Sequence, residues 1–311
     1  MREKYKVEQM NKISMRSSLL LFLAAAIWGV AFVAQSVGMD YMGPFTFNGA
    51  RFFMGSIALM PLICIRRKKD KERKTPREGM KITLMGGICC GLALCMASLC
   101  QQFGIMYTTV GKAGFITTLY IIIVPVMGVF LKKKVPGKVW IGAVIAAFGM
   151  YLLCMSEKMA LSKGDTYVFF CAILFAIHIL SIDYFSPKAD GVELSCIQFL
   201  TAGVISSVFA FIVEKPQLSS FIDGIIPLAY AGIMSCGVAY TLQIIGQKDL
   251  DPTVASLILS LESVVSVLAG WILLGQALCR RELLGCVLVF GAVILVQLPD
   301  RSINGNGEKN V

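Results

Sequence analysis

Long apolar runs recur along almost the whole chain and restrict the fold more than any other feature of the sequence. A bilayer core about 30 Å thick is crossed by about 20 apolar residues of an α-helix. Ten such runs predict ten transmembrane helices, at residues 17–37, 45–65, 82–107, 111–131, 138–155, 166–186, 193–213, 221–246, 253–274 and 282–298. The composition agrees, because 57% of the 311 residues are hydrophobic, whereas soluble domains have about 45–50% apolar residues. We therefore predict an all-α integral membrane protein, in which only residues 108–110 separate the third helix from the fourth.

Lysine and arginine cluster in three segments of the first half. Residues 1–16 hold five, residues 66–81 hold nine and residues 132–138 hold four, whereas residues 38–44 hold none and residues 108–114 hold one. The positive-inside rule places such basic segments in the cytoplasm, and ten crossings return the C-terminus to the same side. We therefore predict a multi-pass protein of the cytoplasmic (inner) membrane with both termini in the cytoplasm. The basic loops then lie beside anionic lipid, and no nucleic-acid partner is expected.

The two halves of the sequence resemble each other. A shift of about 142 positions pairs Gln101 with Gln243 and Leu119 with Leu261, and the order of the apolar runs agrees. Because each half has an odd number of crossings, the second half enters the membrane from the opposite side, as in many secondary transporters. We predict two inverted five-helix repeats. The predicted division is a basic cytoplasmic N-terminus at 1–16, repeats at 17–155 and 166–298, a linker at 156–165 and a cytoplasmic tail at 299–311.

Glu262 lies near the middle of the ninth run, where an ionised group costs roughly 2.5 kcal/mol or more. On an α-helix it shares one face with small and hydroxylated residues that include Ser260, Ser263 and Ser266. The other face can meet lipid, and it includes Leu257, Ile258, Leu261, Val264, Trp271 and Ile272. The serines fit either close helix packing or a polar path. We place Glu262 on the transport path, where it either binds a proton that is exchanged for substrate or presents its charge to a cationic or amine group.

Several other polar or aromatic residues lie inside the runs and are candidates for the same path. They are His178, Gln101, Gln102, Tyr120, Tyr240, Gln243 and Trp28. The His178 imidazole suits proton transfer near neutral pH, but a packing role with satisfied hydrogen bonds fits as well. Arg51 either snorkels to the outer interface or pairs between helices. Pro125 removes a backbone hydrogen bond from the fourth helix and is a hinge candidate.

Four segments carry a resemblance to a known family. They are Ile27-Trp28-Gly29, Arg51-Phe52, GKAGFITTLYIIIVP at 111–125 and SLILSLESVVSVLAGWILLGQ at 256–276. Together they resemble the EamA-like branch of the drug/metabolite transporter superfamily, over about residues 17–298. The family often has Leu-Glu-Pro-Val and Leu-Gly-Glu where this chain has Leu261-Glu262-Ser263-Val264 and Leu274-Gly275-Gln276, so the second acid is missing here. The resemblance implies an inner-membrane carrier or exporter of small metabolites, amino acids or drug-like solutes, with a central cavity built mainly from helices 1, 3, 4, 6, 8 and 9.

The predicted function is therefore secondary transport by alternating access, with export as the expected direction. The sequence has no Gly-x-x-x-x-Gly-Lys-Ser/Thr phosphate loop for ATP. A passive channel or facilitator and a membrane sensor are the alternatives, and an intramembrane enzyme is less favoured because no cluster of acids, histidines or activated nucleophiles occurs. We expect no enzyme activity, cofactor or metal site, and leave proton coupling open. The expected partners are a small-molecule substrate and the lipid bilayer, and a homodimer is left open.

Overall fold

The computed structural model describes residues 2–69, 77–133, 135–154, 162–275 and 280–298, and helices make up most of this part of the chain. Eight segments are long and apolar enough to cross a membrane: Met15–Gly38, Pro44–Lys68, Gly79–Ile105, Val110–Phe130, Lys163–Lys188, Gly191–Glu214, Ile225–Gln247 and Pro252–Leu273. They coincide with eight of the ten predicted runs, and the chain is a multi-pass membrane protein. Two shorter apolar helices, Gly137–Gly149 and Leu283–Val296, occupy the places of the fifth and tenth runs. The count of ten spans stays a prediction.

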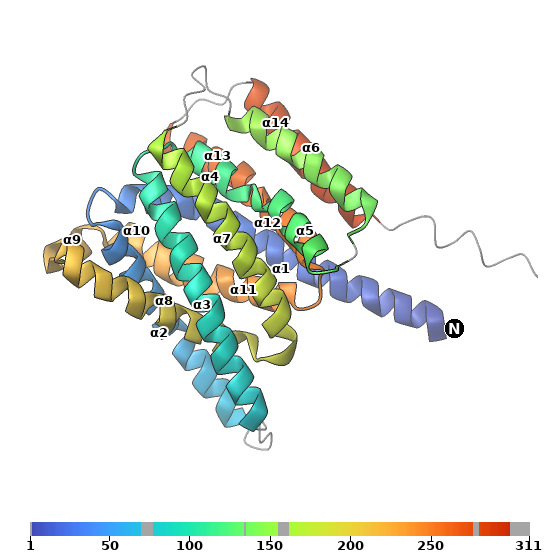
Figure 1. Cartoon of the computed structure of the whole chain (residues 1–311), viewed down its shortest axis with the longest axis horizontal. Helices are drawn as coiled ribbons and strands as arrows, with labels where there is room; N and C mark the ends of the chain where they lie inside the picture. Colours follow the sequence, from blue (N-terminus) through green and yellow to red (C-terminus); the bar gives the residue numbers. More distant parts are fainter. Residues whose placement is uncertain (1, 70–76, 134, 155–161, 276–279, 299–311) are drawn as a thin grey trace, which may run out of the picture.

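The helices follow one another with short connections (Figure 1). The first half contains α1 (Arg2–Gly38), α2 (Pro44–Lys69), α3 (Arg77–Ile105), α4 (Val110–Thr118), α5 (Tyr120–Phe130) and α6 (Gly137–Cys154). The second half contains α7 (Lys163–Phe185), the 3₁₀ turn η1 (Ser186–Lys188), α8 (Gly191–Phe209), the π-helix η2 (Ala210–Glu214), α9 (Leu218–Asp223), α10 (Ile225–Ala229), the π-helix η3 (Tyr230–Tyr240), α11 (Thr241–Gln247), α12 (Pro252–Leu259), α13 (Leu261–Leu274) and α14 (Arg280–Gln297). The predicted tail at 299–311, residues 156–161 of the predicted linker and Gln276 lie outside the described residues.

The predicted boundary between the third and fourth helices is confirmed. α3 ends at Ile105 and α4 begins at Val110. Thr109 caps α4, because its side chain accepts a hydrogen bond from the backbone N–H of Lys112. A threonine in this position satisfies one of the free N–H groups of a helix start, so the short polar segment is sufficient to separate two long apolar helices.

Two of the apolar segments are each broken into two helices near their middle. α4 gives way to α5 at Leu119, and α12 gives way to α13 at Ser260. At the first break the Thr118 hydroxyl donates to the Phe115 carbonyl at 2.9 Å, and at the second the Ser260 hydroxyl donates to the Leu257 carbonyl at 2.7 Å. Such hydroxyl bonds compete with the helical backbone bonds and favour bending. Thr118 and Ser260 are related by the register of the sequence repeat.

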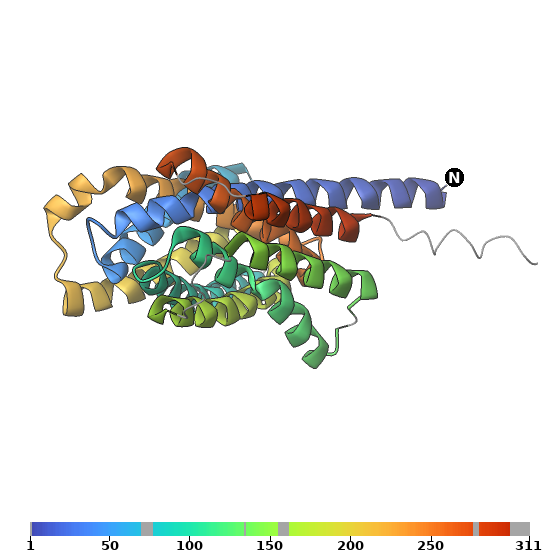
Figure 2. The same cartoon turned by 90° about the horizontal axis from the view of Figure 1, so that it is seen from above.

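Corresponding helices of the two halves pack reciprocally. α2 packs antiparallel on α8, and α6 packs antiparallel on α14, where Gly142 lies against Val296 and Gly149 against Gly285. α3 packs on α7, while η3 and α11, which hold the corresponding place in the second half, pack on α1. α3 also contacts α8, as η3 contacts α2. The pair α6 and α14 lies at one edge of the bundle in Figure 1, and the N-terminal part of α1 extends away from the other helices in Figures 1 and 2.

The ninth apolar segment is buried around most of its circumference, so the expectation that one of its faces meets lipid was wrong for most of its length. Leu257, Ile258 and Leu261 are at most 3% exposed, and exposure begins only near the end, with Trp271 at 49% and Ile272 at 71%. The reason is its position: α12 contacts α1, α5, α6 and α14, and α13 contacts α1, α4, α6 and α14. A single helical wheel also fails to describe a segment that breaks halfway.

Candidate functional site

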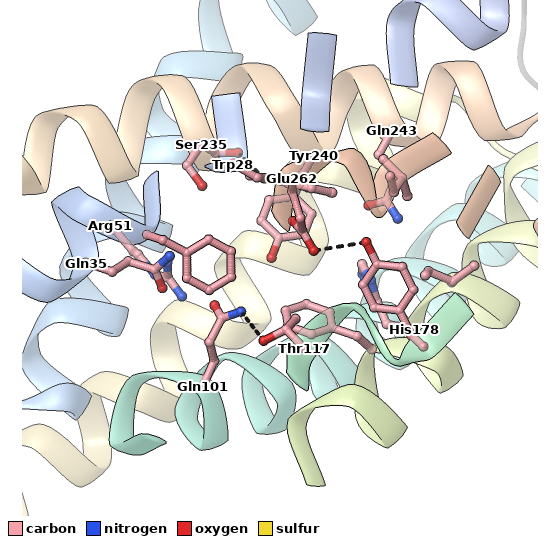
Figure 3. A pocket seen from close by; sticks show the side chains of 15 residues that line it. Trp28, Gln35, Arg51, Gln101, Thr117, His178, Ser235, Tyr240, Gln243 and Glu262 are labelled. Atoms are coloured by element: carbon pink, nitrogen blue, oxygen red, sulfur yellow. Dashed lines mark hydrogen bonds between the residues drawn. The ribbon is translucent and has the colours of Figure 1, made fainter. Parts of the chain in front are cut away.

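Buried polar side chains from both halves surround a small cavity near the two helix breaks (Figure 3). Its volume is about 30 Å³, which is room for about two water molecules. The lining comes from the first, third, fourth, sixth, eighth and ninth apolar segments, the six that the family resemblance implied, and also from the second segment through Arg51. The cavity therefore lies where the two halves meet.

The structure brings together most of the candidate residues. Eight of them line the cavity: Glu262, His178, Gln101, Tyr120, Tyr240, Gln243, Trp28 and Arg51. Five lie outside the lining: Gln102, Ser260, Ser263, Ser266 and Pro125. The side-chain amide of Gln102 donates instead to the main-chain carbonyl of Gln35 at 3.1 Å, and this bond joins α3 to α1. The transport roles of all these residues stay predictions.

The contact between Tyr120 and Glu262 joins the two halves inside the cavity. The Tyr120 hydroxyl donates to Glu262 Oε1 at 2.9 Å, and the two residues are only 3% and 5% exposed. Glu262 lies in the first turn of α13, where the helix dipole favours a negative charge. Tyr120 begins α5, and the two residues are 142 positions apart. They therefore hold equivalent positions in the repeat and meet each other directly.

Aromatic rings form one wall of the cavity. The ring centroids of Trp28 and Tyr240 are 4.6 Å apart, and those of His178 and Tyr240 are 5.9 Å apart. Trp28 Nε1 donates to the Ser235 carbonyl at 3.3 Å. His178 Nε2 bonds Gln198 Oε1 at 3.1 Å, but its Nδ1 has no hydrogen-bond partner among the described residues. The packing interpretation of His178 therefore accounts for one ring nitrogen and leaves the other unexplained.

Arg51 is fully buried, at 1% exposure, and does not snorkel to an interface. The packing of α2 against α8 and η3 keeps the side chain inside the bundle. Its Nε donates to Asn48 Oδ1 at 2.8 Å, and its guanidinium carbon lies 4.9 Å from the ring centroid of Phe52 and 5.8 Å from that of Phe47. All three neighbours belong to α2. In the described part of the chain no carboxylate lies within salt-bridge distance of Arg51, so an ion pair between helices is not found there.

The serines of the ninth segment direct their hydroxyls along their own helix. Ser260, Ser263 and Ser266 each donate to the carbonyl three residues earlier, at 2.7, 2.7 and 2.8 Å. Ser266 also lies directly against Gly114 of α4. Small side chains allow helices to approach closely, so this placement favours the packing interpretation of these serines.

The sequence analysis missed three polar residues of the lining, Gln35, Thr117 and Ser235. The other missed lining residues are apolar: Phe32, Phe175, Ile179 and Leu259. Gln35 lies two helical turns after Trp28, and Thr117 lies about one turn before Tyr120, so helical spacing could have found both. Ser235 lies in the π-helix η3, where α-helical spacing does not apply.

Ion pairs connect the halves on either side of the cavity. Near the start of α4, Lys112 Nζ lies 3.2 Å from Asp165 Oδ2, and the Thr108 hydroxyl donates to Asp165 Oδ1 at 2.6 Å. Beyond the end of α5, Lys133 pairs with Asp183. Asp165 and Asp183 lie at opposite ends of α7. Because α4 and α5 belong to the first half and α7 to the second, the two pairs hold the halves together at both ends.

Comparison with known proteins identifies similar transporters. The model of the EamA-like transporter family matches residues 15–155 and 162–298. An "Uncharacterized transporter" of Archaeoglobus fulgidus is 31% identical over 284 residues, which are 91% of this chain and 86% of that protein. The "Uncharacterized inner membrane transporter YedA" of Escherichia coli K12 is 22% identical over 89% of each chain. A solved crystal structure with 16% identity superposes with a TM-score of 0.74, over 93% of this chain and 98% of that one, and this likeness shows a shared fold.

Proposed function

The chain belongs to the EamA-like transporter family, and we propose that it is a secondary transporter that exports small metabolites, such as amino acids or drug-like solutes, by alternating access. The observation that carries the proposal is the buried Tyr120–Glu262 contact between the halves, beside a polar cavity of about 30 Å³. A polar space of this size admits a solute only after the halves separate on one side. The family and the printed names of the relatives are those of transporters.

The proposal includes ten membrane spans in two inverted five-helix repeats. Three observations support this arrangement: the family model matches the chain twice, corresponding helices pack reciprocally, and the fourth and ninth apolar segments break at related positions. The pairs α2–α8 and α6–α14 each join corresponding helices in antiparallel orientation. Two copies related in this way have their axis across the helices, and in a bilayer that axis lies in the membrane plane.

We propose that both termini lie in the cytoplasm, as the basic segments of the first half indicate. In this orientation the Lys112–Asp165 pair lies toward the outer surface and the Lys133–Asp183 pair toward the cytoplasm. Each pair then closes one end of the path. A reporter enzyme that is active only in the cytoplasm, fused after Val311, should be active. A fusion that is active only when placed outside contradicts the orientation.

Glu262 is the residue that changes its partner in the proposed cycle. While the halves are together, Tyr120 occupies Oε1 of the carboxylate. When they separate, this contact breaks, and the carboxylate needs a new partner because an isolated charge inside a membrane is costly. A proton or the amino group of a solute can fill that place. Because a Glu262 carboxylate without a partner is costly, the halves separate only when a proton or an amino group binds it. The movement of the halves is then coupled to binding at Glu262.

Counterflow in proteoliposomes tests the proposal. Vesicles that contain the purified protein are loaded with one unlabelled solute at a time, and uptake of the same labelled solute is followed. The panel consists of the standard amino acids, short carboxylic acids and cationic dyes. A carrier accumulates label transiently above equilibrium, whereas a passive channel does not. Wild-type protein that is folded and shows no counterflow with the whole panel contradicts the transporter proposal.

The Glu262→Gln variant tests the role of the carboxylate. We expect counterflow to fall about 10- to 100-fold: the amide oxygen can still accept from Tyr120, but the amide cannot bind a proton or balance an amino group, and interactions with a buried charge contribute about 1.5–3 kcal/mol. The matched control is Glu193→Gln, which removes a carboxylate that pairs with Arg67 near the start of α8. This control should keep its counterflow. If Glu262→Gln transports at the wild-type rate with the same pH dependence, the proposed role of Glu262 is wrong.

A further inference from the structure

Arg51 is a buried cation that lacks an acidic partner in the described part of the chain. Its side chain is buried to the same degree as the apolar core, at 1% exposure. Other cations at the helix ends are balanced: Arg67 lies 2.8 Å from Glu193, and Lys112 lies 3.2 Å from Asp165. A buried charge inside a membrane protein is costly unless it is paired, and it marks a functional position by default.

The neighbours of Arg51 satisfy only part of its hydrogen-bonding capacity. Asn48 accepts one bond from Nε, and the rings of Phe47 and Phe52 offer cation–π contact. Nη2 has no hydrogen-bond partner among the described residues. A guanidinium group presents its N–H donors as a planar fork that fits the two oxygens of a carboxylate. Arg51 therefore holds spare donors of the kind that recognise a carboxylate.

The cavity gives these donors a place to meet a ligand. Arg51 lines it together with Glu262. In Figure 3, Arg51 and Gln35 lie at one side of the cavity, and Glu262 and Gln243 lie apart from them. Arg51 comes from α2 in the first half and Glu262 from α13 in the second. The cavity thus has a cation at one side and a carboxylate near its middle, supplied by opposite halves.

We propose that Arg51 binds the carboxylate of the transported solute, so that the substrates are small carboxylates, foremost amino acids, and not organic cations. This inference rests on the proposed transport function and narrows its substrate class. An amino acid with its carboxylate at Arg51 and its amino group toward Glu262 balances both charges of the cavity. An organic cation without a carboxylate leaves Arg51 unbalanced and is repelled by it.

The experiment compares each free amino acid with its carboxamide, which has the same side chain and amino group but no carboxylate. Both compounds compete for counterflow of a labelled amino acid, and both are added to purified protein in a thermal-unfolding assay that does not depend on transport. For wild-type protein, the amide should require at least about 10-fold more compound than the acid, as expected for loss of a charge-assisted pair. Arg51→Gln should abolish this difference, and Arg51→Lys, which keeps the charge without the fork, should retain part of it.

The matched control is Arg67→Gln, the same substitution near the other end of α2, which should leave the preference for the acid unchanged. Wild-type protein that accepts the amide as well as the acid, or that transports only solutes without a carboxylate, overturns the inference and leaves the transporter proposal intact. An Arg51→Gln variant that still prefers the acid also overturns it. If gel filtration shows that Arg51→Gln does not fold, the Arg51→Lys variant is used for the test. A preference of Arg51→Lys for the acid over the amide that equals that of wild type then contradicts the role of Arg51 in binding the carboxylate. Thermal stabilisation by the acid without any counterflow contradicts the transporter proposal instead.

Discussion

The two broken segments, α4–α5 and α12–α13, have similar backbones and different chemistry. Each breaks beside a hydroxyl that donates to the carbonyl three residues earlier, from Thr118 in one and Ser260 in the other. Directly after the break, α5 presents Tyr120 to the cavity and α13 presents Glu262. The repeat therefore preserves the shape of the backbone, whereas single side chains give one half a hydrogen-bond donor and the other half an acid.

The helices beside these segments differ in how they are held. α1 approaches α13 at Gly29, where a Cβ atom would lie 2.4 Å from Cβ of Val265 and 2.8 Å from the Glu262 carbonyl oxygen. In the first helix of each half a shift of 147 positions fits better, since it pairs Trp28 with Phe175, and it pairs Gly29 with Ala176 of α7, which is fully buried.

α7 is tied to the first half by ion pairs at both of its ends. α7 also packs closely on α3, where a Cβ atom on Gly164 would lie 2.6 Å from the Gly104 carbonyl oxygen. The α1 contact therefore depends on close backbone approach, whereas α7 combines close approach with ion pairs.

The largest effect is expected from Gly29→Ala. The added methyl group meets the backbone of α13 at a distance that requires the helices to move apart, and overpacking of a tight contact costs about 1–3 kcal/mol. We expect the equilibrium constant for folding to fall about 5- to 150-fold, as that cost implies, so thermal unfolding should begin at a lower temperature. Gel filtration and thermal unfolding in detergent measure the change.

The companion variant Ala176→Gly tests whether the α1–α13 contact is the tighter of the two. It removes one methyl group from α7 and adds backbone freedom, for which a cost of about 1 kcal/mol is expected. Its effect should be clearly smaller than that of Gly29→Ala. Equal losses in the two variants would mean that the α1–α13 contact is no tighter than its counterpart in α7.

Tyr120→Phe is the next largest change, because it removes the hydroxyl that joins the two halves and keeps the ring. Initial counterflow rates should fall about 5- to 10-fold, less than for Glu262→Gln, because the carboxylate loses one donor but keeps its charge. The double variant Tyr120→Phe/Glu262→Gln should be no slower than Glu262→Gln, since the groups act as a pair. Tyr230→Phe is the control, because its hydroxyl donates to the Ile27 carbonyl away from the cavity lining. If the fold-loss of the double variant equals the product of the two single fold-losses, the two residues act separately.

The sequence predicted the spans well and the site only in part, for physical reasons. Hydropathy is a local property, so eight spans and the boundary at residues 108–110 were found at their places. No proline or glycine lies beside the breaks at Leu119 and Ser260, so the sequence does not mark them. The complete burial of Arg51 and the burial of Leu257 on all sides follow from the packing of other helices. Such contacts are tertiary, and one sequence without its neighbours in space does not specify them.

The smallest effect is expected from the two ion pairs, and it concerns direction more than rate. In the proposed orientation, Asp183→Asn loosens the cytoplasmic end and Asp165→Asn the outer end. Lys133 and Asp183 are partly exposed, and such ion pairs contribute little. Asp165 is buried, at 3% exposure, but an asparagine oxygen in its place can still accept from Thr108. Each variant should therefore shift the balance between inward-open and outward-open states only about two- to fivefold. The substrate concentration that gives half-maximal transport is measured from each side of oriented vesicles. It should be lower on the cytoplasmic side for Asp183→Asn and lower on the outer side for Asp165→Asn. Shifts in the same direction would mean that the pairs hold α7 in place without closing opposite ends of a path, and the functional contrast between the charged and the close-packed contact would be lost.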